Sequence, residues 1–466
     1  MYLEQFFVEG LGCASYLVGC EGAGVAAVVD PDRDVDKYLA AAAAHGLTLT
    51  HIIETHLHAD HVSGNTELQA RTGAGIYVHE GADAGFEHQP LREGDSLDLG
   101  NVRLTVRHTP GHTPESITLL VSDRTRAQEP WMALTGDTLF VGDIGRPDLV
   151  GLDAARGLAS QMYDTIQDEL LPLPDGVMVY PGHGAGSLCG KSIGAVRSTT
   201  IGFERHNNPA LHPREREAFV EFAVAELPEQ PANVRRIKAM NRRGPRPLGQ
   251  VTPRPLTIQT AIGYFQSGAA LLDLRDKASF KASHIPGAVH LPLDDQLSNR
   301  IGFVLPPDVP VILMLPAGNE ATDYARTVYA LARVGYDSVA GYLAESLTVW
   351  QAYGLPLTAG DVQDIAPAEL NSLLETGNGR RPLILDVREA WEFEQGHVPG
   401  ARLISLGELA GRIGELDTAT PVAVICATGS RSQSAAALLG QKGFETVYNV
   451  TGGTMRWMQS GLPLER

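Results

Sequence analysis

The chain has 466 residues, of which 43% are hydrophobic and 20% are charged, and its formal net charge is −18. At roughly 100 to 200 residues per domain, this length predicts two to four folded domains. A negative balance of this size provides no electrostatic footprint for nucleic acid or for an anionic membrane, so we expect neither as a partner. An anionic substrate must therefore be captured by a local pocket.

The N-terminus and the cysteines point to the cytoplasm. No basic segment precedes an apolar run at the N-terminus, and no window approaches about 18 uninterrupted apolar residues, which disfavours export and membrane spanning. The four cysteines, Cys13, Cys20, Cys189 and Cys426, include no close pair and do not resemble a disulfide framework. We expect a cytoplasmic protein with reduced thiols, in which Cys13 and Cys20 pack in an apolar strand.

Residues 1 to about 230 alternate strand-like and helix-like patterns. Apolar runs typical of strands lie at 24–30, 49–56, 75–80, 102–109 and 131–137, and helical patterns lie at 61–73 and 153–171. This alternation predicts a layered α/β domain. Residues 231–255 are rich in Pro, Arg and Asn and lack apolar periodicity, which predicts a linker or a strap over a surface. We place the domain boundary near residue 245.

The rest of the chain contains an internal repeat. Asp273 and the run that starts at His284 correspond to Asp386 and the run that starts at His397, 113 positions later in both cases. Both copies also end in Gly-Leu-Pro-Leu. The sequence therefore predicts three domains, at 1–245, 250–358 and 361–466, of which the last two share one α/β fold.

Side chains that bind metals gather at the ends of the predicted strands. The stretch ETHLHADHVSG supplies four of them, His56, His58, Asp60 and His61, and three more end later strands, namely His112, Asp137 and His183. Open α/β folds bind ligands at the carboxyl ends of their strands, where side chains from one sheet can converge. Histidine and carboxylate groups are ligands of zinc and of non-haem iron. We therefore predict a metal centre.

The motifs that contain these residues, T-H-x-H-A-D-H, G-H-T, T-G-D and P-G-H, resemble the αββα metallo-β-lactamase fold in its glyoxalase II and persulfide dioxygenase branches. In the hydrolase branch, the resemblance implies two zinc ions bridged by Asp137, one held by His56, His58 and His112 and the other by Asp60, His61 and His183. In the dioxygenase branch, it implies one Fe(II) held by His56, His112 and Asp137, with open positions for substrate and dioxygen. The ligand residues alone do not decide between the branches.

Two further elements favour the dioxygenase branch. The Gly-Arg-x-Asp run resembles an element near the dioxygenase pocket, which implies that Arg146 anchors a carboxylate or phosphate of the thiol carrier and that Asp148 orients it. In a simpler interpretation, Arg146 only fixes a loop. The Gly-rich loop around Cys189 resembles dioxygenases fused to rhodanese domains, where this thiol could line the substrate pocket and carry sulfane sulfur. A buried, inert thiol is the alternative.

A loop in the last domain is typical of sulfur chemistry. Residues 422–440 predict a strand, a tight loop that begins at Cys426 and a helix, so that backbone N–H groups form an anion cradle. These groups and Arg431 favour the reactive thiolate. The C-x4-R spacing, with Asp386 upstream, resembles the rhodanese sulfurtransferases. This resemblance implies two parallel-sheet α/β domains in which Cys426 carries sulfane sulfur and Arg431 supports the loop or its charge.

The corresponding loop of the first copy lacks these chemical groups. Leu315 stands opposite Cys426 and Glu320 stands opposite Arg431, although one glycine of the loop, Gly318, is retained. An acidic side chain repels the anions that an active loop attracts. We therefore predict that this copy is an inactive rhodanese-like domain that acts as a spacer or a docking surface.

The domain order resembles the bacterial persulfide dioxygenase–rhodanese fusions of sulfide detoxification. This resemblance implies an Fe(II) enzyme that oxidises a low-molecular-weight thiol persulfide with dioxygen to sulfite, and a rhodanese that uses sulfite as acceptor to form thiosulfate. The main alternative is a dinuclear zinc thioester hydrolase of the glyoxalase II type, and a third interpretation is a non-catalytic scaffold for sulfur trafficking. The thiol carrier and the oligomeric state stay open, with a homo-oligomer as one option.

Overall fold

The computed structural model describes the chain except for residues 188, 191–192, 226, 228–232, 306–307, 360–361 and 377–380. It contains two compact units, residues 1–250 together with 332–335, and residues 251–331 together with 336–466. Within the part of the chain that is described, no helix is long and apolar enough to cross a membrane.

The first unit contains two mixed six-stranded sheets. The first sheet has the order β1-β2-β3-β4-β5-β6, with bounds Tyr2–Val8, Cys13–Cys20, Val25–Val29, Thr48–Ile53, Gly75–His79 and Gln89–Leu91. The second has the order β12-β11-β10-β9-β8-β7, with bounds Thr199–Thr200, Met178–Pro181, Met132–Gly136, Ile117–Asp123, Val102–His108 and Ser96–Leu99. The α-helices of this unit are α1 Asp36–Ala44, α2 Asn65–Thr72, α3 Leu152–Asp164, α4 Ile201–Asn207, α5 Arg216–Val224 and α6 Val234–Arg243.

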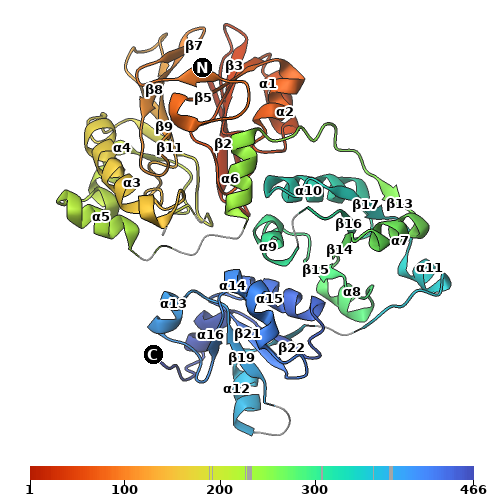
Figure 1. Ribbon diagram of the computed structural model, residues 1–466. Coiled ribbons are helices and arrows are strands. Elements are labelled where there is room, and N and C mark those ends of the chain that lie inside the picture. The colour runs from red at the N-terminus through yellow and green to blue at the C-terminus, as the bar shows by residue number, and fades with distance from the viewer. Residues whose placement is uncertain are drawn as a thin grey trace. The chain divides into compact units, whose positions relative to one another are not determined.

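Burial of apolar side chains on both faces of each sheet produces the layers that Figure 1 shows. Between the sheets, Tyr16 of β2 and Leu104 of β8 share one core. On its outer face the first sheet packs against α1 through Tyr38, and the second sheet packs against α3 and α5, where Phe219 is buried. Successive residues of a strand point to opposite faces, so each sheet can bury two apolar sets. The predicted αββα layering is confirmed.

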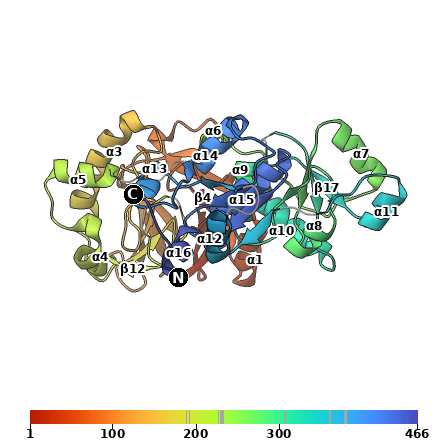
Figure 2. The same ribbon diagram turned by 90° about the horizontal axis from the view of Figure 1, so that it is seen from below.

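Helix α3 supports the loop that precedes the G-H-T motif. It continues into a π-helical segment, Thr165–Leu170, and the Thr165 hydroxyl donates to the Pro110 carbonyl oxygen at 2.7 Å. Gly111 packs directly on this helix, since a Cβ there would lie 2.6 Å from Met162 Cβ. Helices α3 and α5 lie side by side in both views (Figures 1 and 2), so the support is itself braced by a second helix.

Helix α6 occupies part of the segment that the sequence predicts as a linker or strap. Its buried residues, Val234, Ile237 and Asn241, are three and four positions apart and therefore lie on one helical face. Only two of them are apolar, so the periodicity is too weak to be recognised among the basic residues around it. The linker prediction is wrong for 234–243, and residues 231–232 lie outside the described part.

The second unit contains two parallel five-stranded sheets. The first copy has the order β13-β17-β16-β14-β15, with bounds Pro255–Leu256, Val339–Leu343, Val311–Met314, Ala270–Asp273 and Val289–His290, and the helices α7 Ile258–Gln266, α8 Lys277–Ala282, α9 Leu297–Val304, α10 Glu320–Arg333 and α11 Leu347–Ala352. The second copy has the order β18-β22-β21-β19-β20, with bounds Gln363–Ile365, Val447–Val450, Val422–Ile425, Leu383–Asp386 and Arg402–Leu403, and the helices α12 Pro367–Thr376, α13 Ala390–Gln395, α14 Leu406–Arg412, α15 Ser430–Gln441 and α16 Gly453–Gln459.

The two copies repeat one buried ion pair, which accounts for part of the sequence repeat. Arg275 donates from Nη2 to Asp273 Oδ2 at 2.6 Å, and Arg388 donates from Nη2 to Asp386 Oδ2 at 2.7 Å. Both carboxylates are fully buried at the end of a central strand. Removing one partner of such a pair leaves an uncompensated charge, so the residues serve the fold rather than the chemistry.

The copies also share a buried tryptophan that closes the C-terminal turn. Trp350 Nε1 donates to the Pro356 carbonyl oxygen at 3.0 Å, and Trp457 Nε1 donates to the Pro463 carbonyl oxygen at 2.8 Å. In the second copy the tryptophan is fully buried. Each indole therefore combines core packing with one hydrogen bond to the chain that follows α11 or α16.

Trp457→Ala should lower the free energy of unfolding of the second unit by about 3 to 5 kcal/mol, because it leaves a large cavity. Trp457→Phe keeps most of the ring and loses one hydrogen bond, so it should cost about 1 to 2 kcal/mol. Calorimetry of the full chain measures the shift, with Met458→Ala as a control because Met458 is 50% exposed. Equal effects of Trp457→Ala and Met458→Ala would contradict the packing.

Candidate functional site

The loop after β4 carries the histidine-rich motif, and a buried amide from α6 fixes its path. Asn241 donates from Nδ2 to the carbonyl oxygens of His58 and His61, each at 2.7 Å. Its Oδ1 accepts from the Ser63 backbone N at 2.9 Å. Three bonds from one side chain therefore hold the loop. Sequence reasoning missed Asn241, since no chemical signal marks it within the predicted linker.

Three buried side chains direct ligand atoms toward one point. Among the described residues, His56 Nε2, His112 Nε2 and Asp137 Oδ2 have no hydrogen-bond partner. Asp137 Oδ2 lies 3.2 Å from His112 Nε2 and 4.0 Å from His56 Nε2, and one ligand atom of each residue lies within 4.8 Å of the others. Because buried polar atoms are normally hydrogen-bonded, three converging orphans fit a metal ion. The structure thus brings the three predicted iron ligands together.

The other ring nitrogen fixes the tautomer of each histidine. His112 Nδ1 donates to the Arg146 carbonyl oxygen at 2.9 Å. His56 Nδ1 lies 3.1 Å from Thr55 Oγ1, whose own proton goes to Asp30 Oδ2 at 2.8 Å, so His56 Nδ1 must be the donor. Each Nε2 therefore carries the lone pair that a metal needs. Burial lowers the pKa of both His56 and His112, which keeps both rings neutral.

His183 is engaged at both ring nitrogens. Its Nδ1 lies 2.7 Å from Asp137 Oδ1 and its Nε2 lies 2.8 Å from Asp60 Oδ2. Burial opposes the charged form, but the charge of Asp137 raises the pKa of His183 well above its usual value. An imidazolium that donates to two carboxylates offers no lone pair to a metal. In this arrangement, Oδ1 of Asp137 binds His183, and Oδ2 faces His56 Nε2 and His112 Nε2.

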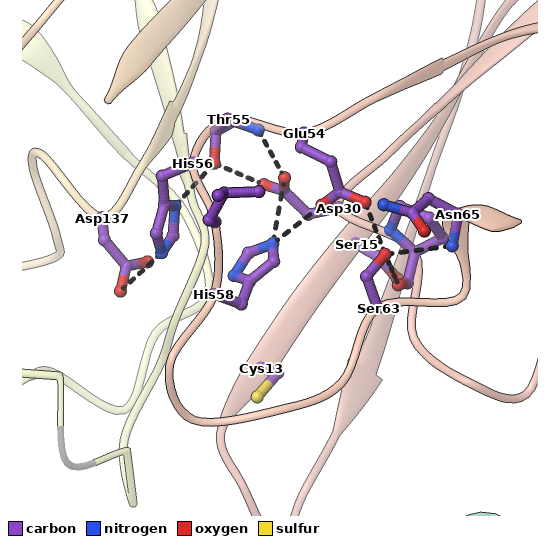
Figure 3. A network of polar contacts seen from close by, with 12 residues as sticks. Cys13, Ser15, Asp30, Glu54, Thr55, His56, His58, Ser63, Asn65 and Asp137 are labelled. Atoms are coloured by element: carbon purple, nitrogen blue, oxygen red, sulfur yellow. Dashed lines mark hydrogen bonds and ion pairs between the residues drawn. The ribbon is translucent and has the colours of Figure 1, made fainter. Parts of the chain in front are cut away.

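His58 turns away from the cluster (Figure 3). Its Nε2 lies 3.2 Å from both Asp30 Oδ1 and Glu54 Oε2, and Figure 3 shows the ring directed toward Asp30 while His56 faces Asp137. Burial opposes protonation, but the charge of Asp30 raises the pKa of His58 well above its usual value. Sequence reasoning missed Asp30, although it ends a predicted strand as the chosen ligand residues do.

A second metal-capable group lies beside the first. His58, Asp60 and His61 each offer a ligand atom within 4.8 Å of the others. His58 Nδ1 and His61 Nε2 are orphans within the described part of the chain, while His61 Nδ1 lies 3.2 Å from Asp60 Oδ1. His61 Nε2 is therefore open toward a second ion, while the other two residues predicted to hold that ion, Asp60 and His183, are bonded to each other.

Arg146 and Asp148 form a buried pair next to the cluster. The guanidinium donates from Nε to Asp148 Oδ1 at 2.7 Å and from Nη2 to Asp148 Oδ2 at 2.8 Å. Such bidentate pairs are strong and directional. The pair holds the backbone segment whose carbonyl accepts from His112. This is the loop-fixing interaction, and the role of Arg146 as a substrate anchor stays a prediction.

Two buried thiols lie close to the carboxylates of the site. Cys189 offers its sulfur within 4.8 Å of ligand atoms of Asp137 and His183, and burial raises the pKa of its thiol to about 12. The neutral form is a poor nucleophile. Cys13 donates from Sγ to Asp60 Oδ2 at 3.0 Å, so it does more than pack, whereas Cys20 lies in the core between the sheets.

The predicted strand, loop and helix around Cys426 are present in the second unit. Cys426 follows β21 and is buried, and its Sγ accepts from the Gly429 backbone N at 3.1 Å. Gly429 adopts a φ of 102°, a left-handed conformation that favours glycine. Directly after it, α15 begins and directs its positive end at the loop. The loop can therefore hold a thiolate or the anionic end of a persulfide.

Arg431 is bound to an acidic partner. Its Nη1 and Nη2 donate to Glu392 Oε2 and Oε1 at 2.6 and 2.7 Å. The pair joins α15 to α13, so it restrains the helix that opens after the loop. Because Glu392 balances the charge, Arg431 supports the loop chiefly by position.

The first copy keeps the loop shape and fills it with its own carboxylate. Gly318 has a φ of 109°, close to that of Gly429, and its backbone N donates to Glu320 Oε1 at 3.1 Å. The glycine N–H of this loop therefore bonds to the Cys426 thiol in the second copy and to the Glu320 carboxylate in the first. Leu315 is buried at the cysteine position. These groups leave the first copy without a nucleophile in its loop.

Comparisons with known proteins agree with this architecture. Residues 8–183 match the family model of the Metallo-beta-lactamase superfamily, and residues 259–353 and 366–460 each match the Rhodanese-like domain. A metallo-beta-lactamase from Staphylococcus aureus subsp. aureus COL has 34% sequence identity and a TM-score of 0.64, with 74% of this chain and 98% of that chain covered.

Two relatives with named activities each match less than half of this chain. The persulfide dioxygenase ETHE1 of Mus musculus is 29% identical over 216 residues, which are 45% of this chain and 75% of that protein. A hydroxyacylglutathione hydrolase of Rhodospirillum rubrum is 37% identical over 172 residues, which are 36% of this chain and 60% of that protein. The chain belongs to the metallo-beta-lactamase superfamily and carries two rhodanese-like domains after its metallo-beta-lactamase domain.

Proposed function

We propose that the first domain is an iron-dependent persulfide dioxygenase and that the last domain is a rhodanese that converts the sulfite formed into thiosulfate. One observation carries the first part: three orphan ligand atoms, on His56, His112 and Asp137, face one point while His183 is hydrogen-bonded at both nitrogens. Two histidines and one carboxylate are the ligand set of non-haem Fe(II) oxygenases, which keep positions open for substrate and dioxygen.

Bound Fe(II) would supply a redox-active Lewis acid at which a thiol persulfide and dioxygen react. The overall reaction is RSSH + O₂ + H₂O → RSH + SO₃²⁻ + 2H⁺, which balances. The Nδ1–H donors of His56 and His112 fix the ring tautomers, and burial keeps both rings neutral and excludes bulk water. We also propose that Arg146 and Cys189 border the persulfide pocket, since both contact the loops that carry the ligands.

The second step uses Cys426. Its thiolate attacks the outer sulfur of another persulfide, the donor S–S bond breaks, and RS⁻ leaves, so that Cys426 becomes a persulfide. Sulfite then attacks the outer sulfur, thiosulfate forms, and the Cys426 thiolate leaves. The Gly429 N–H, 3.1 Å from Sγ, and the N-terminus of α15 stabilise negative charge in this loop.

A dinuclear zinc thioester hydrolase is the second candidate. The observation that favours it is the presence, among the described residues, of three further orphan nitrogens, His58 Nδ1, His58 Nε2 and His61 Nε2. The similarity to a hydroxyacylglutathione hydrolase supports it as well. A second ion at this position would require His183 to exchange Asp60 for the metal. Metal content therefore separates the two candidates.

His112→Ala should remove most of the iron, because it deletes one of three ligands. His61→Ala, an equally buried histidine in the same pocket, should keep about one iron per chain and its oxygen uptake. Elemental analysis and an oxygen electrode, with glutathione persulfide or coenzyme A persulfide as substrate, measure both. Two zinc ions per chain, one of them lost in His61→Ala, would contradict the dioxygenase and support the hydrolase.

Cys426→Ala should leave oxygen uptake unchanged and turn the product from thiosulfate to sulfite, because the sulfur carrier is lost while the metal ligands are intact. Chromatography of the sulfur anions during turnover measures the change. Cys20→Ala, which removes a thiol from the core between the sheets, should still yield thiosulfate. If Cys426→Ala also stops oxygen uptake, the two sites act as one, and the assignment of separate steps is wrong.

A further inference from the structure

A chain of hydrogen bonds runs from the Cys426 sulfur to the inactive copy, and it is built from residues to which no role in sulfur transfer has been given above. Cys426 Sγ lies 3.5 Å from Ser432 Oγ and is the donor of this hydrogen bond. Ser432 Oγ lies 2.7 Å from Asn449 Oδ1, and Asn449 Nδ2 donates to Asp364 Oδ1 at 3.1 Å. Asp364 Oδ1 accepts from Lys277 Nζ of the first copy at 2.6 Å.

The direction of each bond follows from the far end. A carboxylate only accepts, so the Asn449 side chain must turn its NH₂ group toward Asp364 and its oxygen toward Ser432. That oxygen also only accepts, so it takes the single proton of the Ser432 hydroxyl. The other close neighbour of this hydroxyl, the Gly429 carbonyl oxygen at 3.1 Å, is an acceptor as well. Ser432 therefore presents a lone pair to Cys426.

This direction suits a neutral thiol and opposes a thiolate. A thiol can donate its proton to the Ser432 lone pair across the 3.5 Å between Sγ and Oγ. A thiolate needs donors, and Ser432 can become one only by releasing Asn449. Ser432 is fully buried and Asn449 is 8% exposed, so water does not readily replace either partner. Among the described residues, the Gly429 N–H is the donor placed to face the ionised sulfur.

We propose that Asn449 is a positioning residue for sulfur transfer, which holds the Ser432 proton away from Cys426 until a sulfur donor arrives. We further propose that the inactive copy assists through Lys277, which holds the Asp364 carboxylate that orients Asn449. The inference rests on the proposed role of Cys426 as sulfur carrier. It gives the inactive copy a direct part in the chemistry of the active one.

Other charged groups near the sulfur are balanced pairs and do not replace this chain. Arg431 of α15 is held by Glu392 of α13, and the charges of Cys426 and Glu389 also act on Arg431. Asp386, at the end of the neighbouring strand β19, is paired with Arg388. Substitutions of Asn449 and Lys277 leave these pairs intact, so the effect of the chain can be measured separately.

The test is the rate at which Cys426 in the full chain reacts with iodoacetamide across a range of pH, measured by mass spectrometry of its peptide. Asn449→Ala frees the Ser432 proton to bond the thiolate, so alkylation at pH below the midpoint should rise about tenfold and the midpoint should fall. In Ser432→Ala/Asn449→Ala most of this gain should be lost, because no hydroxyl remains to donate to the thiolate. A purely structural role would not produce this dependence on Ser432.

Lys277→Met should raise the rate of Cys426 alkylation at pH below the midpoint by about twofold, and only at low salt. Lys277 and Asp364 are 36% and 45% exposed, so salt screens the attraction between them. Lys281→Met, which removes an exposed lysine of the same helix, should have no effect. The proposal is overturned if Asn449→Ala leaves the profile unchanged or raises its midpoint in a protein that melts as wild type does. It is also overturned if Ser432→Ala/Asn449→Ala keeps the full gain.

The outcome does not depend on turnover. If Asn449→Ala shifts alkylation but the wild-type protein transfers no sulfur from thiosulfate or a persulfide, the proposed function fails and the hydrogen-bond chain stands. If sulfur transfer is present and alkylation does not shift, the function stands and the chain fails. If Asn449→Ala does not fold, Ser432→Ala decides: it removes the lone pair that opposes the thiolate, so alkylation at low pH should rise, by less than in Asn449→Ala because no hydroxyl is left to donate, and an unchanged rate overturns the proposal.

Discussion

The geometry of the ligand cluster in the first domain depends on the carboxylate of Asp137. One oxygen binds His183 and the other faces His56 and His112, so a single side chain joins the ends of strands from both sheets. If Asp137 bound only histidines, the cluster would be a closed hydrogen-bond network. Because one oxygen has no hydrogen bond, the network stops at the place where a cation fits. The fold therefore provides both the anion that attracts a metal and the donor that orients this anion.

The rhodanese-like copies show the same principle in a simpler form. In both, a glycine in the left-handed region directs one backbone N–H into the loop. In the second copy this N–H meets the Cys426 thiol, and in the first it meets the Glu320 carboxylate. A cradle built from backbone donors accepts whichever anion the sequence supplies. The different groups in the two loops therefore need no change of fold, and the first copy remains available to support its neighbour through Lys277.

Much of this arrangement can be predicted from the sequence, because its signals are local. Strand-end histidines and the repeated Asp and His positions identify the layers, the ligand cluster and the tandem copies. Interactions between distant segments leave no such signal. Asn241 contacts the histidine loop from a helix whose basic composition hides its weak apolar periodicity. Which two carboxylates bind His183 depends on the folded positions of Asp60 and Asp137. The sequence shows seven metal-capable side chains equally, whereas the structure separates those with free ligand atoms from those with hydrogen-bond partners.

The number of metal ions is then a matter of competition at His183. Moving its Nε2 onto a second ion breaks the hydrogen bond to Asp60, at about 1.5 to 3 kcal/mol. Structural zinc in zinc-finger peptides contributes about 10 to 16 kcal/mol, so abundant zinc can overcome this bond. Zinc also binds such ligands more tightly than Fe(II) does. A second ion binds only if its binding free energy exceeds the cost of breaking the hydrogen bond between His183 and Asp60. The concentration of zinc relative to iron decides whether it does. The proposed one-metal iron centre therefore requires that free zinc is kept scarce.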